Sequence, residues 1–123
     1  MKPTIESLEG KVWPEPDFKS SLIVSAHALR KKPLDELTPN DLRVAFKEDV
    51  GADFLKEAVL GVLLKEPAVD AAFFEGDLLL SVMRSRQFRE DAGFRSKISE
   101  LADRALQVIS YRPTVDEIQK LRG

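Results

Sequence analysis

Few side chains of the 123-residue chain offer catalytic chemistry. The absence of cysteine excludes a thiolate nucleophile, a thiolate metal site and a disulfide framework. The single histidine, His27, follows the apolar Ala26 and has only Ser25 nearby as a hydroxyl, which favours a structural role over general-base catalysis. No G-x-S-x-G, P-loop or G-x-G-x-x-G pattern is present, so neither a nucleophile elbow nor a glycine-rich phosphate loop is indicated.

Carboxylates are the remaining groups that could do chemistry. Several lie at expected helix ends or in linkers, where capping or solvation accounts for them: Glu48, Asp49, Asp70, Glu75 and Asp77. A small hydrolase that uses Glu75 and Asp77, or a cation site, stays open as an alternative, although the calcium-loop pattern D-x-D-x-D-G is absent. We therefore expect no catalytic residue, metal, cofactor or small-molecule substrate, and interpret the chain as a binding protein.

Charge is distributed unevenly along the chain, whose net charge is −2. Residues 1–33 carry six Lys or Arg and four Asp or Glu, a net charge of +2. Residues 34–78 carry four and eleven, a net charge of −7, and residues 79–123 carry nine and six, a net charge of +3. If the helices bring these acidic residues to one face, the field attracts a basic partner and repels nucleic acid. The alternative is that they are ordinary solvated helix faces.

Two basic stretches indicate a different kind of partner. Arg30-Lys32 ends an expected helix, where cations complement the helix dipole. The second stretch, Arg84-Lys97, comprises Arg84, Arg86, Arg89, Arg95 and Lys97. Contact with RNA or DNA is one interpretation, but Glu90 and Asp91 interrupt the stretch and no aromatic side chain is interleaved for stacking. Pairing with the acidic part of the chain is the other interpretation.

The elements that must position these charges begin with residues 1–17, which we expect to form an extended arm because four residues break helix and strand patterns: Pro3, Gly10, Pro14 and Pro16. Trp13 is expected to dock this arm on the core, with an exposed binding anchor as the alternative. Asp17 is the expected N-cap of a helix that runs to Lys32 and carries apolar residues at helical spacing: Phe18, Leu22, Ala26 and Leu29.

Two further helices are predicted in the middle of the chain. Thr38 fits the N-cap and Pro39 the first position of a helix that we expect Gly51 to close. Residues 52–66 are apolar at most positions and precede Pro67, which is typical of a central buried helix.

Three helices are expected in the last part of the chain. Residues 78–83 favour a helix over a strand, because Gly76 and Asp77 resemble a helix start and no other segment offers a strand partner. Apolar residues at helical spacing over 94–109 predict a long amphipathic helix. Thr114 and Glu117 resemble a capping box that opens a terminal helix.

The predicted fold is all-α, one domain over residues 1–123 with an arm (1–17) and a helical body (18–123) of about five or six helices around residues 52–66. No apolar run approaches the roughly 20 residues that span a bilayer, and the first residues lack the apolar stretch of a signal peptide. We therefore expect a cytoplasmic protein without a membrane partner.

Four short motifs stand out between residues 8 and 83: LEGKVWPEP (8–16), LRKKPL (29–34), DLR (41–43) and EGDLL (75–79). Together they resemble bacterial immunity proteins of contact-dependent growth inhibition systems. The resemblance implies a non-enzymatic cytosolic protein that binds and neutralises the toxic C-terminal domain of a cognate effector. Such toxins are often nucleases, and clustered carboxylates can occupy a basic nuclease cleft in place of phosphates.

The resemblance also implies that the shared motif positions hold the fold: Trp13, Leu29, Pro33, Leu34, Leu42 and Leu78, with Asp41 and Asp77 as helix caps. Exposed acidic residues between the motifs are then the predicted toxin-binding residues: Asp35, Glu36, Glu48, Asp49, Asp53 and Glu57. The expected partner is thus a toxin domain rather than a nucleic acid. A nucleic-acid-binding regulator that uses Arg30-Lys32 and Arg84-Lys97 is the alternative.

Overall fold

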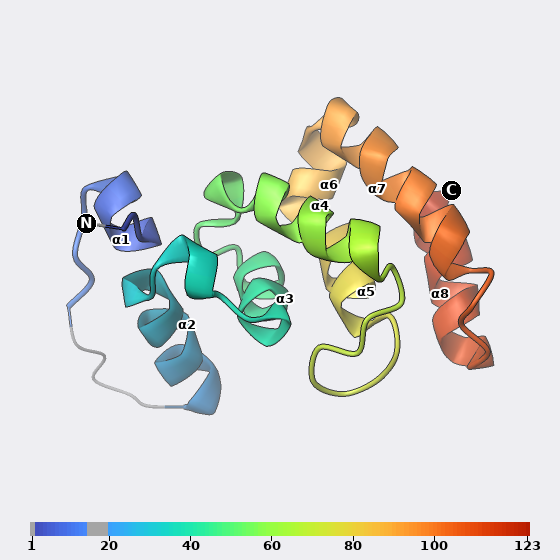
Figure 1. The fold of residues 1–123 in the computed structure, drawn as a ribbon, viewed down its shortest axis with the longest axis horizontal. Coiled ribbons are helices and arrows are strands. Elements are labelled where there is room, and N and C mark those ends of the chain that lie inside the picture. Colours follow the sequence, from blue (N-terminus) through green and yellow to red (C-terminus); the bar gives the residue numbers. More distant parts are fainter. Residues whose placement is uncertain (1, 15–19) are drawn as a thin grey trace.

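Helices dominate the computed structural model, which describes residues 2–14 and 20–123 (Figure 1). In chain order they are α1 (Ile5–Glu9), α2 (Ser21–Lys31), the 3-10 helix η1 (Leu34–Glu36), α3 (Pro39–Glu48), the 3-10 helix η2 (Ala52–Phe54), α4 (Lys56–Lys65), α5 (Asp77–Met83), α6 (Arg86–Glu90), α7 (Ala92–Ala105) and α8 (Arg112–Arg122). Helices α1 and α2 lie at one end of the molecule and α7 and α8 at the other (Figure 1). The described residues form isolated bridges but no strand, so the all-α prediction is confirmed.

The centre of the fold is α5. All of its residues except Ser81 are buried, and α3, α6, α7 and α8 pack against it. The expectation of a central helix over residues 52–66 is wrong. That segment divides into η2 and α4, and only Val59 and Leu63 of α4 are buried, while Leu64 is 62% exposed. An apolar composition alone does not place a helix at the centre of a fold, because a helix is buried on all sides only where other elements surround it. Helix α4 packs mainly on α7, α3 and η2.

The N-terminal arm is not extended throughout. Residues Ile5–Glu9 form α1, because the side chains of Thr4 and Ser7 each accept a hydrogen bond from the other's backbone N–H in a capping box. Ile5 is fully buried against Gly51, where an added Cβ would lie 2.5 Å from the Ile5 side chain. Gly51 therefore leaves room for α1, and the prediction that it closes the preceding helix is wrong, because α3 ends at Glu48 with Asp49 as a C-cap in the left-handed conformation (φ 55°).

Helix starts were predicted with mixed success. The start of α3 is confirmed, with Thr38 as N-cap, Pro39 in the first turn and Asp41 completing a capping box. The predicted cap Asp17 lies outside the described residues, and the cap seen for α2 is Ser20. The predicted box at Thr114 is wrong, because Pro113 is tolerated in a first turn and α8 already begins at Arg112.

The predicted helix at 78–83 is confirmed as α5, and the one predicted over 94–109 is confirmed as α7, which ends earlier, at Ala105. Asp91 caps α7 and receives a hydrogen bond of 2.7 Å from Lys56, which, together with the Phe94 N–H, lowers the pKa of the Asp91 carboxyl. This contact joins α4 to the start of α7. Among the described residues, no helix is both long and apolar enough to cross a membrane.

Candidate functional site

The six predicted toxin-binding residues are all exposed, and they lie in two groups. Asp35 and Glu36 lie in η1, where their carboxylates are 3.4 and 3.6 Å from Lys2 Nζ. Contact with Asp35 is the main reason that the pKa of the Lys2 ammonium is raised. The other four residues follow each other from the end of α3 through η2 to the first turn of α4, and we name them the acidic group: Glu48, Asp49, Asp53 and Glu57.

Arg86 joins two members of the acidic group. Its Nε donates to Asp49 Oδ2 at 2.9 Å and its Nη2 to Asp53 Oδ1 at 3.3 Å, while Nη1 donates to Glu90 Oε2 at 3.0 Å. These hydrogen bonds, from Asp49 first and Glu90 second, raise the pKa of the Arg86 guanidinium further. One guanidinium thus holds two aspartates beside each other. Glu48 and Glu57 form no ion pair with any described residue.

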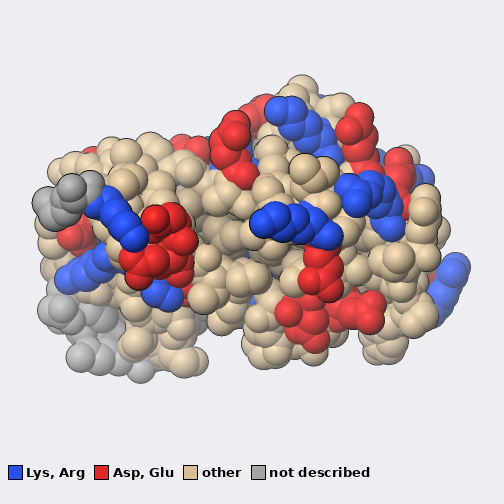
Figure 2. Space-filling view, in the orientation of Figure 1, with Lys and Arg blue, Asp and Glu red and all other residues tan. Residues whose placement is uncertain are grey.

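The surface charge is mixed rather than uniformly acidic on the face that Figure 2 shows. Acidic and basic side chains alternate there in small groups across the molecule. Asp35 and Glu36 thus lie in a different element, η1, from the acidic group. On the face that Figure 2 shows, the acidic residues of the middle of the chain do not form one continuous negative surface. Any role in binding rests on local groups of carboxylates.

The basic stretches are used largely inside the fold. Lys32 pairs with Asp41 at 2.8 Å and Arg84 with Glu117 at 3.2 Å. Arg89 and Arg95 donate to the backbone carbonyls of Arg84 and Arg89 at 2.8 and 2.9 Å. Lys32 and Arg86 thus pair with the acidic part of the chain, through Asp41 and through Asp49 and Asp53. The interpretation does not extend to the other cations that make contacts, because Arg84 pairs with a residue of the last part of the chain and Arg89 and Arg95 bind backbone carbonyls.

Arg30 is poorly placed to contact a nucleic acid, because the residue is only 1% exposed. Its guanidinium donates to the Glu9 carboxylate and, at 2.9 Å, to the carbonyl of Lys11, and lies 3.9 Å from Glu6 Oε2. It also lies 4.1 Å from the centroid of the Trp13 ring, which is partly buried against the core as predicted. Helical spacing was the signal for this burial, since Arg30 shares a face with two buried residues, Ala26 and Leu29.

Asp77 is not the helix cap that the sequence analysis predicted. Gly76 occupies the N-cap of α5, and the buried Asp77 carboxylate accepts hydrogen bonds from the backbone N–H groups of Ala71, Ala72 and Phe73 at 2.7, 3.0 and 2.8 Å. Asp77 therefore shapes the preceding loop, residues 66–76. With its oxygens engaged in this way, Asp77 is a structural group, and no metal-binding cluster occurs among the described residues.

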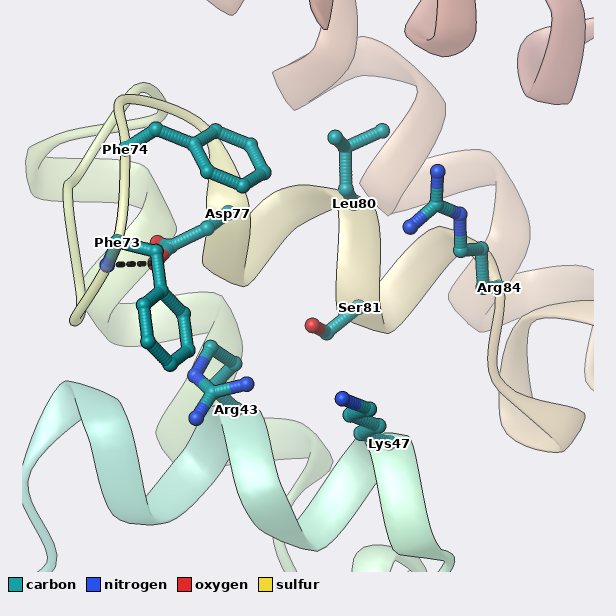
Figure 3. Close-up of a pocket in the computed structure, with 8 residues that line it drawn as sticks. All are labelled: Arg43, Lys47, Phe73, Phe74, Asp77, Leu80, Ser81 and Arg84. Atoms are coloured by element: carbon teal, nitrogen blue, oxygen red, sulfur yellow. Dashed lines mark hydrogen bonds between the residues drawn. The ribbon is translucent and has the colours of Figure 1, made fainter.

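The loop that Asp77 shapes presents an exposed aromatic surface that was not predicted from the sequence. Phe73 and Phe74 are 71% and 40% exposed. They border a pocket of about 210 Å³ between α3 and α5, which is also lined by Arg43, Lys47, Asp77, Leu80, Ser81 and Arg84 (Figure 3). The sequence signal for this surface was the pair of adjacent aromatic residues between Pro67 and Gly76, because a contiguous exposed apolar patch is typical of an interaction site.

Comparison with known proteins identifies the family. The model of the CDI immunity proteins, the immunity proteins of contact-dependent growth inhibition, matches residues 7–109. Neither a curated protein nor a solved structure matches the chain. The matched region runs from within α1 to just beyond α7, and so it contains the acidic group, the contacts of Arg30 with Glu9 and Lys11, and the pocket that Phe73 and Phe74 border. This chain therefore belongs to the family of CDI immunity proteins.

Proposed function

We propose that the chain binds and neutralises the toxic domain of a cognate effector in the cytoplasm, without catalysing a reaction, and that the acidic group contacts the toxin. Family membership supports the neutralising role. The observation that supports the surface is the presence of four exposed carboxylates over residues 48–57, two of which, Asp49 and Asp53, are held in place by Arg86. Fixed side chains lose little conformational entropy on binding.

The proposed toxin is a nuclease. A nuclease carries a basic substrate cleft, and carboxylates presented at this cleft take the place of substrate phosphates. Glu48 and Glu57 have no cation among the described residues, so their charge is available to such a partner. Asp35 and Glu36 supply a second, flanking contact from η1, weakened by their proximity to Lys2.

Binding and neutralisation are tested with the toxin domain encoded next to this chain. We expect a stable 1:1 complex, and loss of DNA or RNA cleavage by the toxin domain when one equivalent of the chain is added. No complex at micromolar concentrations would contradict the neutralising role. A toxin domain that binds the chain but cleaves neither nucleic acid would contradict only the nuclease part.

The surface is tested by charge reversal at residues that make no ion pair. The double variant Glu48→Lys, Glu57→Lys changes the acidic group without breaking the Arg86 contacts. We expect its association rate with the toxin to fall about tenfold at low salt and to depend less on salt. The matched control Glu66→Lys, Asp70→Lys makes the same change in net charge at exposed residues outside the group that also form no ion pair with a described residue. Equal rates for the two double variants would place the contact elsewhere.

A further inference from the structure

A second surface carries the opposite charge, and one of its residues, Lys47, directly precedes Glu48 of the acidic group in α3. Its side chains come from three elements: α3 supplies Arg43 and Lys47, α5 supplies Ser81 and Arg84, and the loop supplies Phe73 and Phe74. Figure 3 shows Arg43 and Lys47 rising from α3 toward α5, with Phe73 next to Arg43 at the mouth of the pocket. We name this surface the Arg43 pocket.

Arg43 is buried without a counter-charge. It is 8% exposed, its Nε donates to Asn40 Oδ1 at 2.9 Å, and its guanidinium carbon lies 4.6 Å from the centroid of the Phe73 ring. Among the described residues, no carboxylate is within ion-pair distance of Arg43. Burial of a charge is costly unless an opposite charge and hydrogen bonds compensate for it. The Nη nitrogens of Arg43 are not among the fully buried polar atoms that lack a partner, so they are accessible to an anionic group that enters from outside.

The other charges of the pocket leave it positive. Lys47 is exposed and, like Arg43, has no carboxylate partner in the described part of the chain. Arg84 shares its charge with Glu117. Asp77 also lines the pocket, but its carboxylate accepts three backbone hydrogen bonds from the loop. Two cations thus face the pocket without an ion-pair partner there.

We propose that the Arg43 pocket receives a carboxylate side chain of the toxin domain, with an apolar neighbour of that residue covering Phe73 and Phe74; this inference rests on the proposed function. The guanidinium fork of Arg43 matches a carboxylate in shape and charge, and Lys47 and the Ser81 hydroxyl supply further donors. The toxin is then held at two oppositely charged places, its basic cleft on the acidic group and an acidic side chain in the pocket.

The aromatic rim favours a protein over a free anion. A free phosphate satisfies the cations but leaves Phe73, which is 71% exposed, in water. Exposed aromatic side chains beside an arginine are typical of the residues that dominate binding energy at protein interfaces. The surface also continues past the pocket, because an adjacent groove shares Phe74, Leu80 and Arg84 and extends to Tyr111 and Pro113. Its loop is already fixed by Asp77, which limits the entropy lost on binding.

The test compares affinities of the purified toxin domain for the wild-type chain and for three single variants. Arg43→Met and Lys47→Met each remove one cation of the pocket, and Lys31→Met removes an exposed cation of α2 as the matched control. We expect the dissociation constant to rise about tenfold or more for Arg43→Met and several-fold for Lys47→Met. The Lys31→Met value should stay within about twofold of the wild-type value. Lys47 makes no contact on which folding depends, so its variant remains informative if Arg43→Met is destabilised.

Double-mutant cycles then identify the carboxylate on the toxin. Exposed Asp and Glu residues of the toxin domain are changed singly to Asn or Gln, and we expect one of them to couple to Arg43→Met. Wild-type affinity in both pocket variants, or coupling to none of the carboxylates, would overturn the inference while leaving the proposed function intact. Saturable binding of inorganic phosphate at the pocket with unchanged toxin affinity would also overturn it. A wild-type chain that fails to bind the toxin domain would contradict both proposals.

Discussion

Two arginines of the described chain are almost completely buried, in contrasting surroundings. Arg30, at 1% exposure, is surrounded by the carboxylates of Glu9 and Glu6 and by the carbonyl of Lys11. Arg43, at 8% exposure, has a hydrogen bond to Asn40 and no carboxylate among the described residues. Each rests against an aromatic ring, Trp13 or Phe73. A buried charge that the fold compensates serves the fold, whereas one that it leaves uncompensated beside a pocket marks a binding surface.

The largest expected effect is a difference in the loss of stability when each of the two arginines is substituted. Arg30→Met removes the cation from two partly buried carboxylates, and we expect the free energy of unfolding to fall by about 3 kcal/mol. Arg43→Met removes one hydrogen bond and one cation–π contact, so we expect a loss of about 1 kcal/mol. Urea denaturation of both variants measures the difference. Equal losses would remove the distinction between the two sites.

An intermediate effect is expected at Asp77, which shapes the rim of the Arg43 pocket. Asp77→Asn replaces a carboxylate that accepts three backbone hydrogen bonds with an amide oxygen that cannot satisfy all of them, and we expect a loss of about 2 kcal/mol. Hydrogen exchange of the Ala71–Phe73 amides should accelerate. The exposed Asp70 offers the control Asp70→Asn, which should change neither quantity. Unchanged exchange in Asp77→Asn would show that the loop is held by other contacts.

The smallest effect concerns a partly exposed ion pair, Lys32 with Asp41, close to Arg30 in sequence. Partial burial opposes ionisation of Asp41, but hydrogen bonds from Lys32 and Thr38 outweigh it and hold the pKa of the carboxyl below its usual value of 3.8. A lowered pKa in the folded state stabilises the protein above the unfolded-state pKa, and this contribution is lost as the pH falls through the folded-state pKa.

Asp41→Asn should therefore lower the free energy of unfolding near pH 7 by about 1 kcal/mol or less, because both side chains of the pair keep part of their surface in solvent. The difference in the free energy of unfolding between variant and wild type should shrink as the pH falls below about 4. Chemical denaturation over this pH range measures it, with Glu66→Gln as a variant that removes an unpaired carboxylate. A gap that persists unchanged at acid pH would assign it to packing or capping rather than to charge.

Local sequence signals predicted much of the fold. Thr38 and Pro39 start α3, the helix start at Gly76 and Asp77 predicted α5, and apolar spacing predicted α7, because such signals act over one or two turns. Burial in three dimensions was less predictable. The apolar segment 52–66 lies at the surface with one face inward, and α5 holds the centre, because packing depends on which helices meet rather than on composition.

The candidate site was predicted only in part. The six acidic residues are exposed as expected, but their division into two groups and the role of Arg86 depend on contacts between residues more than 30 positions apart. The Arg43 pocket escaped prediction for the same reason, since its cations lie on α3 and its aromatic rim lies on a loop that Asp77 shapes. Helical spacing could have placed Arg30 inside, but nothing in the sequence distinguishes it from Arg43 as a compensated charge.

The most direct test of the central claim is hydrogen exchange of the wild-type chain, alone and with one equivalent of the toxin domain. The claim is that the toxin covers the acidic group and the Arg43 pocket and leaves the Arg30 site to the fold. We expect the toxin to slow exchange in peptides that cover residues 43–57 and 70–74, with no change in residues 5–11. Slowed exchange confined to residues 5–11 and α2, with residues 43–57 and 70–74 unchanged, would contradict the claim.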